Sequence, residues 1–92
     1  MIKSFRDAAT EELWLTGTSR RFRTAARVAM RKLYMLQIAE KLVDLRIPPA
    51  NHLEALKGRL AGKHSIRVND QWRVVFKWDS DGASDVEIVD YH

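Results

Sequence analysis

The chain has 92 residues, 46% of them hydrophobic and 30% charged, with a net charge of +4 and a pI near 9.8. This length suits a single domain, residues 1–92, that buries roughly 60 to 65% of the surface exposed by the unfolded chain, and the lack of cysteine excludes disulfides and thiolate metal sites. No stretch approaches the roughly 18 apolar residues of a membrane span, so we expect a soluble cytoplasmic protein without membrane contact.

The amino terminus is predicted to form a strand followed by a short helix. In "MIKSF" apolar residues stand among polar ones in a way that is typical of a short strand. Asp7 or Thr10 can then cap a helix that runs through "EELWL". Gly17 is expected to end this helix, because glycine readily adopts the left-handed conformation of a helix carboxyl terminus.

A longer amphipathic helix is predicted from Ser19 or Arg20 to about Ala39, because apolar residues recur there at helical spacing. These apolar positions are Phe22, Ala26, Ala29, Leu33 and Leu36. The same segment contains six basic residues and no acid: Arg20, Arg21, Arg23, Arg27, Arg31 and Lys32. Such a basic face is either simply solvated or a surface that attracts a polyanion.

The second half of the chain is predicted to be a sheet. A helical turn in "AEKLVDLRIPP" cannot continue past Pro48 and Pro49. Four strands are predicted after the prolines, in "HLEALKG", "KHSIRVN", "QWRVVFKW" and "SDVEIVDYH". Residues 69–71 and "DSDGAS" are rich in turn-forming side chains, so they are expected to connect the last three strands as hairpins.

Alternation along these strands separates two faces of the sheet. The apolar face, which we expect to pack against the long helix, contains Ile66, Val68, Trp72, Val74, Phe76, Trp78, Val86 and Ile88. The opposite face, which the helices are expected to leave uncovered, contains Arg67, Arg73, Lys77 and Tyr91. The pattern therefore predicts an α+β fold with an open, basic sheet surface.

Three patterns in the chain resemble ligand-binding motifs but lack a required residue or spacing. "GRLAGKHS" resembles a phosphate-binding loop, but it has three residues between its glycines, and His64 stands where a serine or threonine is required. In "DSDGASD" the glycine comes too early for a calcium loop. The three histidines, His52, His64 and His92, lack the spacing of a local zinc site. We therefore expect neither a metal nor a cofactor.

The chain ends in "VDYH", which places a carboxylate, a phenol and an imidazole in succession. Asp90, Tyr91 and His92 carry groups that general acid–base catalysis uses, and histidine titrates closest to neutral pH. Taken alone, the tripeptide is also compatible with a frayed polar tail.

Combined with the basic sheet face, this ending suggests cleavage of RNA without a metal. In that reaction a base removes the proton of a 2'-hydroxyl, the oxygen attacks the adjacent phosphate, and an acid protonates the leaving 5'-oxygen. The charge that develops around phosphorus calls for fixed cations, which Arg73, Arg67 and Lys57 can supply. Because DNA lacks the 2'-hydroxyl, the substrate would be RNA.

Four stretches of the chain together resemble the HigB-type toxins of the RelE/ParE superfamily, in particular their GraT-like, host-inhibition branch. These stretches are "MIKSF", "LEALKG", "HSIRVNDQWRVVF" and the terminal "VEIVDYH", and the resemblance extends over nearly the whole chain. It implies a RelE-like α+β fold, in which two amino-terminal helices pack on one face of a small, mainly antiparallel, twisted sheet.

The resemblance also implies a function and partners. It predicts the toxin of a type II toxin–antitoxin system, a ribosome-dependent messenger RNA endonuclease that needs no metal and inhibits translation from the decoding site. A HigA-type antitoxin with a helix-turn-helix domain would neutralise it, and operator DNA would be bound only through that antitoxin. The basic helix would then contact either ribosomal RNA or the antitoxin.

The site residues implied by the resemblance carry over one by one. The family's catalytic residues correspond here to Arg73, Asp90, Tyr91 and His92. The RNA-binding residues are expected to be Glu54, Lys57, His64 and Arg67. Some members have a histidine where this chain has Glu54, so the general base is Glu54, His92 or another group.

Two alternatives belong to other functional classes. A gyrase inhibitor of the ParE branch acts by binding alone, and so does an RNA-binding regulatory module. Neither has a need for the terminal "DYH", which is therefore the sequence feature that favours an endonuclease over both.

Overall fold

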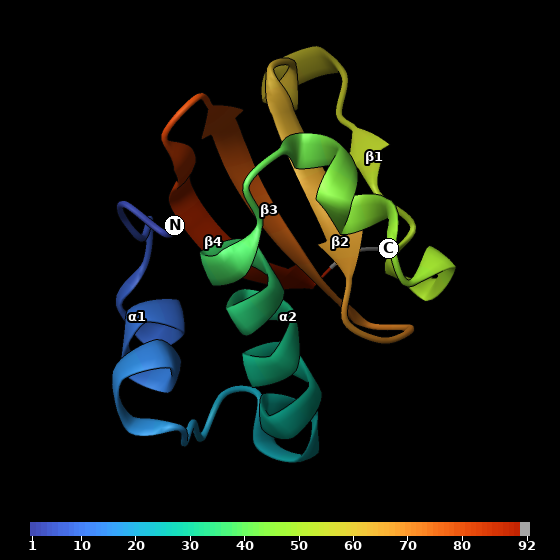
Figure 1. The fold of residues 1–92 in the computed structure, drawn as a ribbon. Helices are drawn as coiled ribbons and strands as arrows, with labels where there is room; N and C mark the ends of the chain where they lie inside the picture. Colours follow the sequence, from blue (N-terminus) through green and yellow to red (C-terminus); the bar gives the residue numbers. More distant parts are fainter. Residues whose placement is uncertain (91–92) are drawn as a thin grey trace.

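The computed structural model describes residues 1–90, which fold into two α-helices, four 3-10 helices and one four-stranded sheet (Figure 1). The helices are α1 (Ala8–Thr16) and α2 (Ala26–Ile38), with the short 3-10 helices η1 (Arg23–Ala25), η2 (Leu42–Arg46), η3 (Pro49–Asn51) and η4 (Gly58–Leu60). The strands are β1 (Glu54–Ala55), β2 (Lys63–Arg67), β3 (Trp72–Asp79) and β4 (Gly82–Asp90). The predicted α+β class is confirmed.

The four strands form an antiparallel sheet in the order β1-β2-β3-β4. The turn between β2 and β3 forms as predicted, because the side-chain oxygen of Asn69 accepts hydrogen bonds from the backbone N–H groups of Gln71 and Trp72 at 2.9 and 2.8 Å. This turn sets a register in which Arg67 lies opposite Arg73. The two arginines of "HSIRVNDQWRVVF" are therefore cross-strand neighbours.

The predicted first strand in "MIKSF" is not an independent strand. Ile2 and Phe5 form isolated parallel bridges with Ala83 and Val86 of β4, and backbone hydrogen bonds such as Lys3 N–H to Ala83 O hold the segment in place. The amino terminus therefore covers the outer edge of β4, which leaves β1 as the exposed edge at the other side of the sheet.

The helices begin and end close to their signals, with one difference. As predicted, α1 follows Asp7 and ends at Gly17, which has a left-handed φ of +77°. However, α2 starts later than the predicted Ser19 or Arg20. Ser19 accepts hydrogen bonds from the backbone of residues 21 and 22, and Arg23 has a positive φ of +46°. This local bonding competes with regular helix, so the first turn is irregular.

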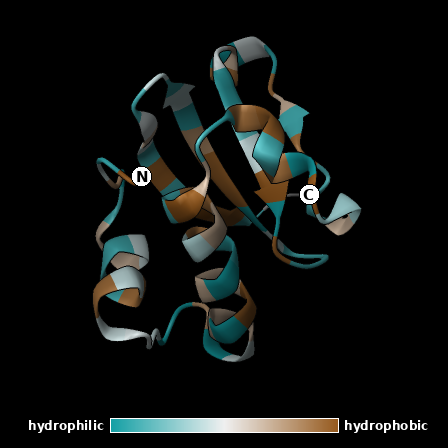
Figure 2. Ribbon diagram, in the orientation of Figure 1, coloured by the Kyte–Doolittle hydropathy of each residue, from teal (hydrophilic) through white to brown (hydrophobic). Residues whose placement is uncertain are grey.

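Both helices pack on one face of the sheet, as predicted (Figure 1). In Figure 2 the middle of β3 is coloured hydrophobic, and α2 shows both hydrophobic and hydrophilic bands, as an amphipathic helix does. Leu33 and Leu36 of α2 and Val74 and Phe76 of β3 are completely buried in one hydrophobic cluster. The predicted alternation along the strands is thereby confirmed.

The opposite face of the sheet is covered around Arg73, whereas Lys77 on the same face is exposed, so the sequence-based expectation of an open face is corrected in part. Ser65, Val75 and Arg73 lie on this face and are buried, with Arg73 only 7% exposed. The predicted strand "HLEALKG" shrinks to the two residues of β1, because the chain turns through η3 before it and η4 after it. Only the two residues of β1 extend the sheet, and the backbone just before them lies against Arg73.

No helix within residues 1–90 is long and apolar enough to cross a membrane.

Replacing Gly82 with alanine is expected to destabilise the fold by displacing the amino-terminal segment. Gly82 has a φ of +128°, and a Cβ atom there would overlap the backbone of Met1. Gly17→Ala is the matched control, because its left-handed φ costs roughly 1 to 2 kcal/mol but its Cβ atom would meet open space. Urea unfolding followed by tryptophan fluorescence should show a clearly larger loss for Gly82→Ala, and equal losses would contradict the proposed overlap.

Candidate functional site

Arg73 is the centre of a polar cluster on the face of the sheet away from the helices. Its Nε donates a hydrogen bond to Oγ of Ser65 at 2.9 Å, and one terminal nitrogen donates to the backbone oxygen of His52 at 2.6 Å. The same nitrogen lies 3.6 Å from a carboxylate oxygen of Glu54. Because these contacts come from two different segments of the chain, residues 52–54 and strand β2, the guanidinium plane is held in one orientation.

Glu54 brings a carboxylate beside this fixed cation. It lies in β1 opposite Ser65, and its side chain is 50% exposed, whereas that of Arg73 is 9% exposed. The pair therefore combines a buried positive charge with a carboxylate that solvent can reach. Glu54 also lines a shallow pocket of about 300 Å³ together with Lys57, so these two predicted residues lie next to one another.

The carbonyl group of His52 is aimed at Arg73 by a strained backbone. His52 has φ +46° and ψ +57°, a left-handed conformation that residues other than glycine adopt at a cost. It follows directly after η3, whose last residue, Asn51, is completely buried. The segment that orients this carbonyl is therefore fixed from inside the protein.

Asn51 holds η3 through two buried hydrogen bonds. Its Oδ1 accepts from the ammonium group of Lys32 on α2 at 2.6 Å, and its Nδ2 donates to the backbone oxygen of Leu45 at 3.1 Å. Lys32 is only 8% exposed, and this burial lowers the pKa of its ammonium, with the nearby guanidinium groups of Arg31 and Arg67 lowering it further. Helix α2 is thereby connected through Asn51 to the backbone that contacts Arg73.

Sequence reasoning missed both Asn51 and Lys32. Lys32 was counted within the basic helix face, but it points into the protein, whereas Arg20, Arg23, Arg27 and Arg31 are exposed. The available signal for Asn51 was a single polar residue between the two prolines and a predicted strand, which is equally typical of a surface loop. Ser65 was also missed, because a serine in a strand carries no distinctive pattern.

Two other predicted residues are Arg67, which lies on the same face of the sheet as Arg73, and Asp90, which lies at the end of β4. Arg67 is beside Arg73 in the register and forms an ion pair with Asp70 across the turn. Asp90 ends β4 opposite Trp72, is exposed, and accepts a hydrogen bond from Nε2 of Gln71 at 3.1 Å. Tyr91 and His92 lie outside the described residues, so their predicted roles stay predictions.

His64 is separated from this cluster. It pairs with Ala55 and Phe76 in the register, and its ring stacks on that of Phe76 with a centroid distance of 6.3 Å. Since neighbouring residues of a strand point to opposite faces, His64 lies on the helix side while Ser65 contacts Arg73. His64 and Arg73 therefore lie on opposite faces of the sheet, and the predicted role of His64 in RNA binding stays a prediction.

Within residues 1–90, no group of three histidine, aspartate or glutamate side chains is arranged to hold a metal ion. The cluster around Arg73 therefore offers a fixed cation, an accessible carboxylate and a neighbouring lysine. These groups suit the binding of a phosphate and the transfer of a proton beside it.

Comparison with known sequences gives a family for nearly the whole chain. The family described as the RelE-like toxin of the type II toxin–antitoxin system HigB matches residues 3–92. Toxin HigB-1 of Vibrio cholerae serotype O1 is 48% identical over 62 residues, 67% of this chain and 64% of that protein. An uncharacterized protein of Haemophilus influenzae is 42% identical over 60 residues, 65% of this chain and 59% of that protein. The alignments thus span less than two thirds of either relative.

Solved structures show the same fold. A chain of the YoeB–YefM complex from Staphylococcus aureus superimposes with a TM-score of 0.57 at 20% sequence identity, covering 100% of this chain and 98% of that one. The YoeB dimer from the same organism gives a TM-score of 0.56 at 21% identity, covering 99% and 94%. At this level of identity the likeness establishes the fold alone.

Substitution of either partner in the buried Lys32–Asn51 pair is expected to destabilise the protein. Asn51→Leu leaves a buried ammonium without its acceptor, which should cost about 3 kcal/mol, because an unsatisfied charged group keeps its full desolvation penalty. Lys32→Met should lower the free energy of unfolding by a smaller amount.

The double variant should be more stable than the sum of the single losses predicts, since each change removes the other's unsatisfied partner. Urea titrations of the four proteins measure this coupling. Strictly additive losses would show that the two side chains do not depend on one another.

Proposed function

Because this chain belongs to the HigB-like family, the RelE-like toxins of type II toxin–antitoxin systems, we propose that it inhibits translation as a ribosome-dependent messenger RNA endonuclease. The observation that carries the proposal is the contact of Arg73 with Glu54, in which a buried guanidinium lies beside an accessible carboxylate. A phosphate and a 2'-hydroxyl of RNA require this combination of groups, a fixed positive charge and a proton acceptor.

In the proposed reaction Glu54 removes the proton of the 2'-hydroxyl, and the resulting oxygen attacks the neighbouring phosphorus. Arg73 stabilises the negative charge that develops on the phosphate oxygens, because its donors are already oriented by Ser65 and His52. His92 donates the proton that the leaving 5'-oxygen needs, while Tyr91 orients the phosphate and Asp90 positions the end of the chain. The products are a cyclic phosphate and a free 5'-hydroxyl.

The surroundings of this cluster support a nucleic-acid substrate. Lys57 lies beside Glu54, and Arg67 lies beside Arg73 on the adjacent strand. Exposed arginines on the η1–α2 segment add positive charge that favours phosphate contacts, and we assign these to ribosomal RNA. Cleavage is then restricted to translating ribosomes in the cytoplasm, because ribosomal RNA supplies most of the binding surface.

An antitoxin is the second proposed partner. The solved relative from Staphylococcus aureus is described as a heterotetrameric YoeB–YefM toxin–antitoxin complex. For this chain we propose a HigA-type antitoxin with a helix-turn-helix domain, which would carry the operator-binding function of the pair.

Arg73→Lys should reduce messenger RNA cleavage by roughly 100-fold, the size of effect seen when one preorganised donor to a developing oxyanion is removed. A lysine cannot reproduce the planar arrangement that contacts both Ser65 and His52. Arg6→Lys, at an exposed arginine paired with Glu87, is the matched control and should retain activity. Primer extension on transcripts after induction measures the cleavage, and cuts that appear without translation would contradict ribosome dependence.

Glu54→Gln should slow cleavage by roughly 100-fold or more, because it removes the proposed base without changing the shape of the side chain.

His92→Gln should also abolish growth inhibition while antitoxin binding is retained. Single-turnover assays on programmed ribosomes separate the two roles. Full activity of Glu54→Gln would exclude it as the base, and gyrase inhibition without any RNA cleavage would overturn the proposed function.

A further inference from the structure

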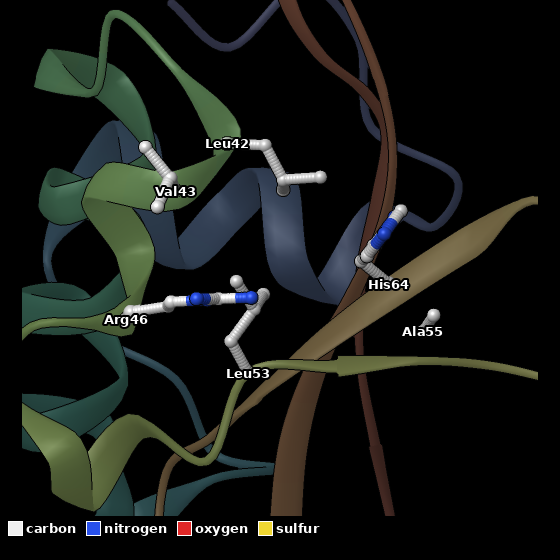
Figure 3. A pocket seen from close by; sticks show the side chains of 6 residues that line it. All are labelled: Leu42, Val43, Arg46, Leu53, Ala55 and His64. Atoms are coloured by element: carbon white, nitrogen blue, oxygen red, sulfur yellow. The ribbon is translucent and has the colours of Figure 1, made fainter.

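A second concave feature lies on the other side of β1 from Arg73. It is a pocket of about 350 Å³ between η2 and the β1–β2 edge of the sheet (Figure 3). Its lining residues are Leu42, Val43, Arg46, Leu53, Ala55 and His64. In Figure 3 Val43 and Arg46 lie on one side of the pocket and Ala55 and His64 on the other. None of the described residues that line it is acidic.

Two nitrogen-bearing groups beside this pocket, in His64 and Arg46, are of interest because of their contacts within residues 1–90. Nδ1 of His64 is buried and has no hydrogen-bond partner within residues 1–90. Arg46 is exposed and forms no ion pair with any of the described acidic residues, while the neighbouring Asp44 is engaged by the backbone of residues 40 and 41. A buried polar atom without a partner is costly, and among the described residues Nδ1 of His64 is covered by protein and unsatisfied beside this pocket.

The remaining walls are aliphatic. Leu42 and Val43 come from η2, and Leu53 precedes β1. The ring of His64 lies nearly parallel to that of Phe76, with a centroid distance of 6.3 Å and an interplanar angle of 25°. The pocket thus offers an apolar space, one imidazole ring and one positive charge.

The position of β1 connects this pocket to the proposed cleavage site. Leu53 and Ala55 line the pocket, whereas Glu54 between them contacts Arg73 on the opposite face. Because β1 is only two residues long and forms the exposed edge of the sheet, an extended ligand can pass around it. An RNA strand that is bound at Glu54 would therefore have its neighbouring nucleotide close to the pocket.

We propose that this pocket binds one nucleotide of the RNA next to the cleavage site and contributes to sequence preference. The base lies between the aliphatic side chains and the imidazole of His64, and Arg46 contacts the phosphate. Single-stranded RNA is recognised in this way, by bases that are unstacked and held in pockets. The assignment of the nucleotide to an RNA substrate rests on the proposed endonuclease function, whereas nucleotide binding itself does not.

The four nucleoside 5'-monophosphates are suitable probes, titrated separately into the full chain and followed by two-dimensional NMR of the backbone amides. Shifts are expected at Leu42, Leu53 and His64, with one base bound more tightly than the others. Arg46→Met should weaken binding at least five-fold for all four. His64→Phe preserves the stacking on Phe76 and should remove the difference between bases.

Arg59→Met serves as the matched control, since it removes another exposed arginine from the same part of the chain. Unfolding curves of each variant verify that the fold is intact. Shifts confined to the exposed arginines of α2, or equal binding of inorganic phosphate without base preference, would overturn the proposal. So would the absence of any shift at millimolar concentrations.

Mapping of cut sites during translation distinguishes this proposal from the endonuclease function. His64→Phe should still cut messenger RNA but with a changed codon distribution. If the unmodified protein binds nucleotides in the pocket but cuts no RNA, the endonuclease function fails and the pocket remains a nucleotide site. If it cuts RNA and His64→Phe cuts at the same codons, the role in sequence preference fails alone.

Discussion

The buried guanidinium of Arg73 is the interaction on which the candidate site depends. An arginine on the face of a small sheet is normally solvated, but here Ser65, His52 and Glu54 surround it. Such a cation cannot reorient easily, so the direction of its N–H donors is set by the protein itself. The cost of removing it from water is offset by the hydrogen bonds that it donates to Ser65 of the neighbouring strand and to the backbone oxygen of His52 before β1.

This arrangement depends on the opposite side of the molecule. Lys32 of α2 bonds to Asn51, and Asn51 ends the short helix that precedes His52. The hydrophobic packing of α2 on the sheet therefore also fixes the backbone that contacts Arg73. The side-chain amide of Asn51 therefore contributes both to the stability of the fold and to the geometry of the site.

The sequence predicted the sheet well, because period-two alternation in β2 to β4 is unambiguous and residues such as Asn69 carry their turn chemistry locally. It did not predict the burial of Arg73, since alternation assigns a face but not what covers it. The cover comes from the backbone of residues 52–54, whose path depends on a left-handed residue and a buried asparagine. The placement of His64 and Arg73 on opposite faces follows from simple alternation and could be predicted from the sequence. The pocket behind β1 could not be predicted, because it depends on where η2 packs.

The contact between Arg73 and His52 has a consequence for how this site will look in other members of the family. The group that holds the arginine is a main-chain oxygen, so the imidazole at position 52 takes no part in it. What the position must supply is a left-handed backbone, which asparagine and glycine provide as readily and β-branched residues do not. A comparison of side chains would therefore show position 52 as variable, although the geometry of the site depends on it.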